Sequence, residues 1–282
     1  MSIPFQGYFI NLDRNADRRA RIEDQLQRLG LSESYERVAA FDGHTLPAKP
    51  EKISRGEYGC FASHVEALSQ GSLTGRHLHI VEDDVLLSPR FLPALSGLEA
   101  QGVFNQVDLL FTDVGFRPDS MTVRALDRVV GDAGPDPKSA PPPVRLLDLN
   151  SLDWACSSSY LVAGRAVERL KQALAADLRT TPQLPLDLRL RTLVKAGQFR
   201  AAVCLPFLTS VALDLDVHSS VREPDTSRIA CNIIRQYFYI DADVSVLESA
   251  LRKHCAVGAL DRRRRTMLDA VAFTMFGDFR MP

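Results

Sequence analysis

The stretch Leu78-His79-Ile80-Val81-Glu82-Asp83-Asp84-Val85 indicates the fold class of this chain. Four largely apolar residues are followed by three carboxylates, after which an apolar residue resumes. Consecutive apolar positions are typical of a strand covered on both faces, as in a parallel α/β sheet. In such sheets the ligand crevice lies beyond the carboxyl ends of the strands. We therefore expect a buried strand whose acidic end faces a ligand site.

Three adjacent carboxylates repel one another, so Glu82, Asp83 and Asp84 need either solvent or a cation to compensate their charge. Oxygen ligands at a strand end suit Mg²⁺ or Mn²⁺, whose coordination is usually completed by substrate phosphates. The alternative is an acidic turn that caps the next helix, which is the commoner role of an isolated acidic triplet. The motifs described below favour the metal site.

Length and composition limit the classes of protein to which this chain can belong. The 282 residues suffice for one large α/β domain, or for one domain with an appendage. A hydrophobic content of 45% and a charged content of 24% are typical of an ordinary globular protein. The formal net charge of −1 gives no indication of a nucleic-acid partner.

Cysteine usage and hydropathy indicate a cytoplasmic protein. The five cysteines are odd in number and lack the spacing of metal ligands, so we interpret them as reduced thiols: Cys60, Cys156, Cys204, Cys231 and Cys255. The N-terminal residues lack the features of a signal peptide, and no apolar run reaches transmembrane length. Any membrane contact is therefore expected to be peripheral, at the inner face of the membrane.

The chain opens with a strand–turn–helix unit. Residues 7–12 predict a short strand, and an amphipathic helix follows and ends at Gly30. The strand end carries Asn11, Leu12 and Arg14, which is a natural nucleotide position. Arginines in the first turn of a helix are poorly placed for its dipole, so Arg14 and Arg18 favour an anionic partner, with a solvated helix start as the alternative.

A second strand is predicted at 37–43, and the glycines at 56 and 59 suit a turn that leads into a helix. Ser63 and His64 would lie on this helix. Taken alone, His64 is more often a packing residue than a catalytic base. Adjacency of a serine and a histidine does not make a nucleophile and its base, because that geometry must come from the fold.

The middle of the chain continues the α/β pattern. After the acidic triplet, Ser88 and Pro89 predict the start of a helix, and a strand is predicted at 107–113. Residues 131–143 are rich in proline and glycine and form an exposed loop, either a linker or a substrate lid. A strand of small residues at 155–162 precedes a helix at 165–176.

Further predictions concern the last third. Asp187 lies just before a helical pattern, either as its N-cap or as a site carboxylate. A strand at 200–208 and an apolar, acidic segment at 211–217 lead to His218. Residues 223–282 differ in composition and are interpreted as a helical appendage to a domain spanning 1–222. The arginine run at 262–265 is either a solvated face or an anchor to anionic lipid.

Several motifs together resemble glycosyltransferase family 25, the lipooligosaccharide galactosyltransferase and collagen galactosyltransferase group. The matching segments are YFINLDRNADRR at 8–19, RVAAFDG at 37–43, GEYGCFASH at 56–64, IVEDDV at 80–85, YLVAGRA at 160–166 and PLD at 185–187. The resemblance extends roughly over residues 7–221. Where the family has a Ser-Asp-Ile-like segment, this chain has Ser219-Ser220-Val221.

The resemblance implies a GT-A fold, which is a Rossmann-like α/β fold with a mostly parallel sheet. It also implies a UDP-sugar donor and a Mn²⁺ or Mg²⁺ cofactor held by Glu82 and Asp84, with His218 as the third ligand from late in the chain. Asp83 would be directed to the ribose or the sugar. The residues expected to bind the donor nucleotide are Asn11, Leu12, Arg14, Arg18, Ser63, His64 and Asp83.

Family 25 enzymes invert the anomeric carbon, which requires a base to take the proton of the acceptor hydroxyl. Asp187 is our first choice for this base and Asp113 the second. The predicted function is transfer of a hexose, expected to be galactose, from a UDP-sugar to a glycan acceptor of the lipooligosaccharide type. The sequence leaves the oligomeric state open.

Two other classes compete with this prediction. A catalytically silent module that binds a sugar nucleotide or a glycan would keep the fold, but it would not need three crowded carboxylates. A nucleotidyltransferase or phosphohydrolase would be expected to show a glycine-rich phosphate loop with lysine, or clustered His and Asp ligands. The sequence has neither of these patterns.

Overall fold

The computed structural model describes residues 5–47, 51–116, 120–131, 143–212, 226–243 and 245–246. Its centre is a sheet with the strand order β2-β1-β3-β9-β5-β10-β7. These strands are β2 (Tyr35–Ala39), β1 (Phe5–Asn11), β3 (His77–Glu82), β9 (Ser159–Val162), β5 (Leu109–Phe111), β10 (Ala201–Leu205) and β7 (Arg145–Asp148). Strands β9 and β7 run against the others, so the sheet is mostly parallel. The predicted Rossmann-like α/β class is confirmed.

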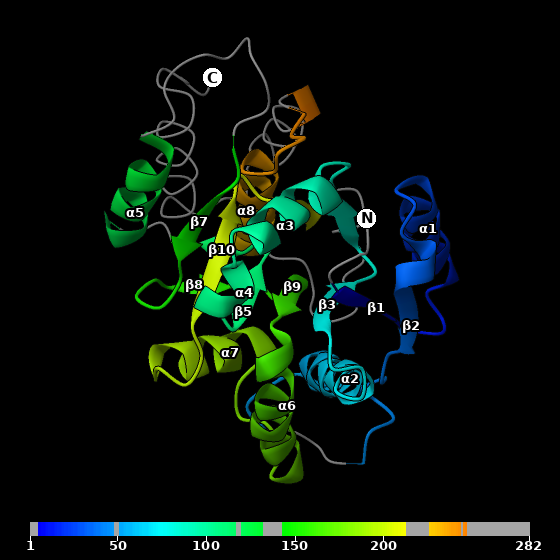
Figure 1. Cartoon of the computed structure of the whole chain (residues 1–282). Helices are drawn as coiled ribbons and strands as arrows, with labels where there is room; N and C mark the ends of the chain where they lie inside the picture. The colour runs from blue at the N-terminus through cyan, green and yellow to red at the C-terminus, as the bar shows by residue number, and fades with distance from the viewer. Residues whose placement is uncertain are drawn as a thin grey trace.

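The described helices cover both faces of this sheet (Figure 1). They are α1 (Ala16–Arg28), α2 (Arg55–Gly71), α3 (Phe91–Ala100), α4 (Val103–Gln106), α5 (Ser120–Gly131), α6 (Gly164–Arg179), α7 (Leu186–Lys195) and α8 (Thr226–Tyr237), with a 3₁₀ turn η1 (Ser32–Ser34). In Figure 1, α2, α6 and α7 lie below the sheet, whereas α1 and α3 lie above it. Two short antiparallel pairs flank it: β4 (Val85–Leu87) with β11 (Thr209–Val211), and β6 (Gly115–Phe116) with β8 (Trp154–Ala155).

Strand β3 is buried on both faces, as its apolar run predicts. Leu78, Ile80 and Val81 have no exposed surface, and β3 lies between β1 and β9. His79 on this strand is also fully buried and stacks on the Phe91 ring of α3, with centroids 4.8 Å apart. Burial lowers the pKa of His79 to about 3, so this side chain is neutral, and its two ring nitrogens contact the hydroxyls of Tyr35 and Ser159.

The start of α2 is fixed by a capping box. The Ser54 hydroxyl accepts a hydrogen bond from the Glu57 amide (3.1 Å), and the Glu57 carboxylate accepts one from the Ser54 amide (2.7 Å). The first turns of α2 pack against the loop that follows β2, because Gly43 and Gly59 allow the two backbones to approach closely. This contact holds the loop at 40–44 beside the end of β3.

Two sequence predictions need correction. The helix after the acidic triplet begins at Phe91 and not at Pro89, because the Ser88 hydroxyl accepts from the Arg90 amide and keeps the intervening residues in a turn. The strand predicted at 155–162 is interrupted at Cys156, whose φ of 71° lies in the left-handed region. Most of the loop predicted at 131–143 lies outside the described residues.

Helix α8 lies within the region predicted as an appendage, yet it packs on the sheet domain. The Phe207 amide donates to the Phe238 carbonyl (2.7 Å), and the Ile240 amide donates to the Phe207 carbonyl (2.9 Å). Side chains of α8 also reach β6 and β11. The domain boundary at residue 222 stays a prediction for the rest of the C-terminal region, most of which lies outside the described residues.

We predict that Gly59→Ala destabilises the protein by about 1–3 kcal/mol, because a Cβ at this position would lie 2.5 Å from the Phe41 carbonyl oxygen and 2.6 Å from the Gly43 amide. The matched control is Gly97→Ala in α3, where a Cβ meets nothing within 4 Å. Alanine should stabilise that helix by about 0.5–1 kcal/mol. Urea denaturation of both variants measures the difference, and equal effects would contradict the close approach of α2 and the loop.

Candidate functional site

A cavity opens at the carboxyl ends of β1, β2 and β3. Its lining comes from Ile10, Leu12, Arg14, Asn15, Arg18, Ala40, Phe41, Asp42, Gly43, His44, Gly56, Cys60, Ser63, His64, Glu82, Asp83 and Asp84. The open space between these side chains, counted with its mouth to solvent, is about 670 Å³.

The position of the cavity follows from the topology. The chain leaves β1 towards β2 on one side, and it then returns to place β3 on the other side of β1. Both connections are parallel crossovers, so their turns separate at this point and leave a crevice. Eight of the predicted donor and metal residues line the cavity: Leu12, Arg14, Arg18, Ser63, His64, Glu82, Asp83 and Asp84.

Glu82 is directed towards α2. Its Oε1 lies 3.4 Å from His64 Nε2 and 3.8 Å from Cys60 Sγ. His64 is fully buried, and its Nδ1 lies 3.0 Å from the Tyr160 hydroxyl of β9. Burial and the neighbouring Glu82 raise the pKa of the Cys60 thiol. A nitrogen, a sulfur and a carboxylate oxygen thus meet at one wall of the cavity.

Asp83 is directed to the other side, towards β1 and α1. It accepts a hydrogen bond from Asn11 Nδ2 (2.7 Å) and one from Arg18 (3.1 Å). Asn11 is itself buried, because Arg37 donates to its side chain and to its carbonyl, both at 3.1 Å. Both oxygens of Asp83 are therefore used within the protein. In the described geometry Asn11 and Asp83 hold the strand ends together, and their contact with the donor stays a prediction.

Among the three carboxylates, Asp84 is the one whose negative charge is least compensated by neighbouring groups. Its Oδ2 lies 3.7 Å from Arg18, and its Oδ1 is buried with no hydrogen-bond partner among the described residues. Burial, together with the negative charge of Glu82, raises the pKa of Asp84 to about 7. A divalent cation beside Oδ1 would supply the missing interaction. The residues of the strand end therefore fit the predicted Mn²⁺ or Mg²⁺.

The other predicted donor residues have distinct surroundings. Arg14, with about half of its side chain exposed, pairs with Asp42 at the mouth of the cavity. The Ser63 hydroxyl accepts from the Phe41 amide (2.8 Å) and donates to the Gly59 carbonyl (2.7 Å), so it ties the loop after β2 to α2. Ser63 thus shapes the wall of the cavity.

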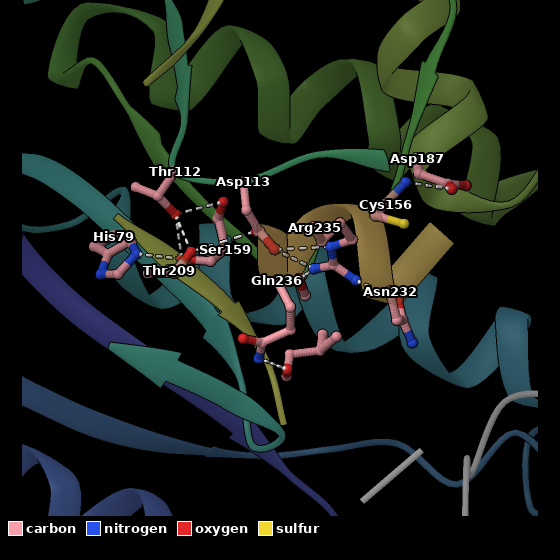
Figure 2. Close-up of polar contacts among 12 residues, drawn as sticks. His79, Thr112, Asp113, Cys156, Ser159, Asp187, Thr209, Asn232, Arg235 and Gln236 are labelled. Carbon is pink, nitrogen blue, oxygen red and sulfur yellow. Dashed lines mark hydrogen bonds and ion pairs between the residues drawn. The ribbon is translucent and has the colours of Figure 1, made fainter. Parts of the chain in front are cut away.

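Asp113, the second choice for the catalytic base, is buried completely (Figure 2). Arg235 of α8 donates to it through two nitrogens, one of them at 2.9 Å, and also donates to the Ser158 hydroxyl. Arg235 is only 3% exposed. This geometry argues against Asp113 as a base, because a buried ion pair has no route to an acceptor hydroxyl. No local sequence pattern indicated Arg235, since α8 lies 122 residues further along the chain.

The ion pair between Arg235 and Asp113 also helps to position the acidic end of β3. Ser158, which Arg235 contacts, accepts the backbone hydrogen bond of Glu82 (2.8 Å). Gln236 of α8 donates to the Val211 carbonyl, and the next residue, Ala212, donates its amide to the Asp84 carbonyl (3.0 Å). Helix α8 therefore positions both the strand that carries Glu82 and the turn that carries Asp84.

Asp187, the first choice for the base, is a residue of the first turn of α7. The N-cap of this helix is Pro185, so the N-cap interpretation of Asp187 is wrong. One carboxylate oxygen accepts from the Cys156 amide (2.9 Å) and the other from the Leu188 amide (2.8 Å). Asp187 is half-buried, and its charge raises the pKa of Cys60 in the cavity wall. His218 lies outside the described residues.

A Rossmann-like sheet with an acidic cavity at its strand ends defines a class of proteins that bind a small ligand, most often a nucleotide, at that edge. Residues 5–113 match the model of glycosyltransferase family 25, described as an LPS biosynthesis protein, which confirms the resemblance over this region. The matched segment covers less than half of the 282 residues, and over it the chain is similar to this family. Every residue that lines the cavity falls inside the matched region, whereas Asp187 and His218 fall outside it. No curated protein matches the chain.

Within the part of the chain that the structure describes, no helix is both long and apolar enough to cross a membrane. The described cysteines are free thiols, as predicted: Cys60, Cys156, Cys204 and Cys231.

We predict that the stability of the metal-free protein falls as the pH rises from about 4 to about 7, and that Asp84→Asn removes part of this fall. The folded state raises the pKa of Asp84 to about 7, so it retains a proton that the unfolded chain releases at lower pH. At pH 8 the variant should be more stable than the wild type by about 1–3 kcal/mol. The control is Asp24→Asn, at an exposed pair with Arg28. Denaturation at several pH values gives the result, and identical pH profiles would contradict it.

We also predict that Arg235→Met costs about 3–5 kcal/mol, because it leaves the Asp113 carboxylate buried without its partner. The double variant Arg235→Met with Asp113→Asn should recover part of this loss, since the unpaired charge is then absent. Arg28→Met, which breaks an exposed pair with Asp24, should cost less than about 1 kcal/mol. An Arg235→Met variant as stable as Arg28→Met would show that α8 is not anchored by this pair.

Proposed function

We propose that this protein is a glycosyltransferase that moves a hexose from a UDP-sugar to a glycan acceptor with inversion at the anomeric carbon, and that it needs a divalent cation. The observation that carries the proposal is the buried, unpartnered oxygen of Asp84 beside Glu82 at the end of β3. Oxygen ligands at this position suit Mn²⁺ or Mg²⁺ together with diphosphate oxygens. Glu82 and Asp84 would hold the cation, and His218 remains the predicted third ligand.

A cation held there would act as a Lewis acid that stabilises the departing UDP. The protein itself supplies further charge. Arg14 lies at the mouth of the cavity, where it can approach phosphate oxygens, and Arg18 lies between Asp83 and Asp84. Because Arg18 already compensates two carboxylates, we assign the direct phosphate contact to Arg14 and the positioning of the acidic strand end to Arg18.

The base is the next requirement of an inverting transfer, since no covalent intermediate forms and the acceptor hydroxyl must lose its proton during attack. We propose Asp187 for this role. It is a half-buried carboxylate on α7, a helix that packs against α2, and α2 carries the cavity residues Cys60, Ser63 and His64.

Galactose is the proposed donor sugar, which rests on the resemblance of the motifs alone. A lipooligosaccharide-type glycan is the proposed acceptor, which the description of the matching family as an LPS biosynthesis protein supports. A cytoplasmic location, with contact to the inner face of the membrane through the C-terminal basic residues, belongs to the same proposal. The competing hypothesis is a silent module of the same fold that binds a sugar nucleotide without transferring the sugar.

A donor panel tests the function. Purified protein is incubated with Mn²⁺ and several UDP-hexoses, with and without acceptor sugars, and UDP release is measured. We expect acceptor-dependent release with one preferred donor, loss of release in EDTA, and loss in Asp84→Asn. Binding of a UDP-sugar without any release would favour the silent module, and release from none of the donors without binding would overturn the proposal.

The Asp187→Asn variant tests the base. An amide cannot accept the proton, so turnover should fall by roughly 10²- to 10⁴-fold while the affinity for the UDP-sugar stays near that of the wild type. If Asp187 binds hydroxyls of the donor sugar, donor affinity should fall together with turnover. The control is Asp153→Asn, whose carboxylate pairs with Lys195 at the surface. Near-normal turnover of Asp187→Asn would end the assignment.

A further inference from the structure

We propose that Cys60, His64 and Glu82 form a second cation site, which binds a thiophilic divalent ion such as Zn²⁺. One donor atom of each residue, namely Sγ, a ring nitrogen and a carboxylate oxygen, lies within 4.8 Å of the other two. The sequence gives a signal in retrospect, because positions 60 and 64 are four apart and share a face of α2. This site is distinct from the proposed Mn²⁺ or Mg²⁺ site, with which it shares Glu82.

The spacing of the donor atoms matches tetrahedral zinc. Zinc binds nitrogen and carboxylate oxygen at about 2.0–2.2 Å and thiolate at about 2.3 Å, which places neighbouring N and O ligands about 3.4 Å apart and S and O ligands about 3.6 Å apart. The observed distances are 3.4 Å from His64 Nε2 to Glu82 Oε1 and 3.8 Å from Cys60 Sγ to the same oxygen. The side chains could therefore hold the ion with little movement.

The surroundings of His64 also suit a metal ligand. Its Nδ1 lies 3.0 Å from the Tyr160 hydroxyl, and the two rings are stacked with centroids 5.7 Å apart. A metal-bound histidine usually donates its other N–H to an oxygen, which fixes the ring. In the tautomer in which Nδ1 donates to the Tyr160 hydroxyl, Nε2 is free of a proton and presents its lone pair towards Glu82 and the cavity, as metal binding requires.

The donor set discriminates between cations. Thiolate and imidazole favour Zn²⁺ and similar ions, whereas carboxylates and phosphates favour Mg²⁺ and Mn²⁺. All three residues line the cavity, so a fourth ligand can come from solvent. Binding displaces the thiol proton of Cys60 into solvent, and the affinity should therefore rise with pH.

Because both sites use Glu82, an ion at one site should affect the other, and this expectation rests on the proposed function. An ion at Cys60, His64 and Glu82 withdraws one ligand from the Mn²⁺ or Mg²⁺ site. Zn²⁺ should then inhibit sugar transfer, and this inhibition should be lost in a Cys60→Ala variant. The binding experiment below uses no donor or acceptor, so its outcome is independent of the sugar-transfer assay.

The test is titration of the full chain with Co²⁺ as a spectroscopic probe, followed by displacement with Zn²⁺. We expect one ion per chain, with a thiolate-to-cobalt charge-transfer band and the visible bands of tetrahedral Co²⁺. Cys60→Ala should lose the charge-transfer band. It should also bind Zn²⁺ at least about 100-fold more weakly, since loss of an outer-shell partner alone costs about 10–100-fold. The matched control is Cys204→Ala, which removes a buried thiol of β10 far from the cavity and should leave the band unchanged.

Three results would overturn the proposal: no charge-transfer band in the folded wild-type protein, an unchanged band in Cys60→Ala, or loss of the band in Cys204→Ala only. Circular dichroism verifies that each variant is folded. If Cys60→Ala does not fold, His64→Gln decides the question, because it should keep the thiol but lose tetrahedral Co²⁺ binding. Unchanged spectra in His64→Gln would equally reject the site.

Discussion

The mutual repulsion of Glu82, Asp83 and Asp84 is the constraint on which the rest of the site depends. The structure separates the three charges by directing each to a different layer. Glu82 contacts α2 through His64, and Asp83 contacts β1 and α1 through Asn11 and Arg18. Asp84 lies half-buried at the turn, with its Oδ1 unpartnered among the described residues. Two of the carboxylates thus gain hydrogen-bond partners within the protein, whereas Asp84 has only the longer contact with Arg18, so that its Oδ1 is left for a ligand.

The support of this strand end comes from segments far apart in the sequence. A chain of buried polar contacts runs from the Tyr35 hydroxyl through His79, Ser159, Thr112 and Thr209 to Asp113 and Arg235, and Figure 2 shows most of it. Every group in a buried network of this kind needs its partner, because an unpaired polar group is costly in an apolar interior. The network therefore fixes α8 against the sheet and makes this helix part of the domain that carries the site.

Two walls of the cavity differ in the kind of cation that their side chains suit. One wall has carboxylates and arginines, which suit a divalent cation and the phosphates of a nucleotide. The other has the thiol, the imidazole and the same Glu82, which suit a softer ion. A single carboxylate belongs to both walls, so a cation bound at one of the proposed sites would limit the ligands available at the other.

The sequence by itself determined the α/β class, the strand with its acidic end, and eight of the residues that line the cavity. These features depend on local periodicity and on motifs within residues 7–84, where strand ends and helix starts follow each other directly. Only the tertiary structure decided that Asp113 is buried by Arg235, that Asp187 lies inside the first turn of α7, and that Cys60 meets His64 and Glu82. Pairing between side chains up to 122 residues apart leaves no local pattern, because it arises only when the sheet brings distant strands and helices together.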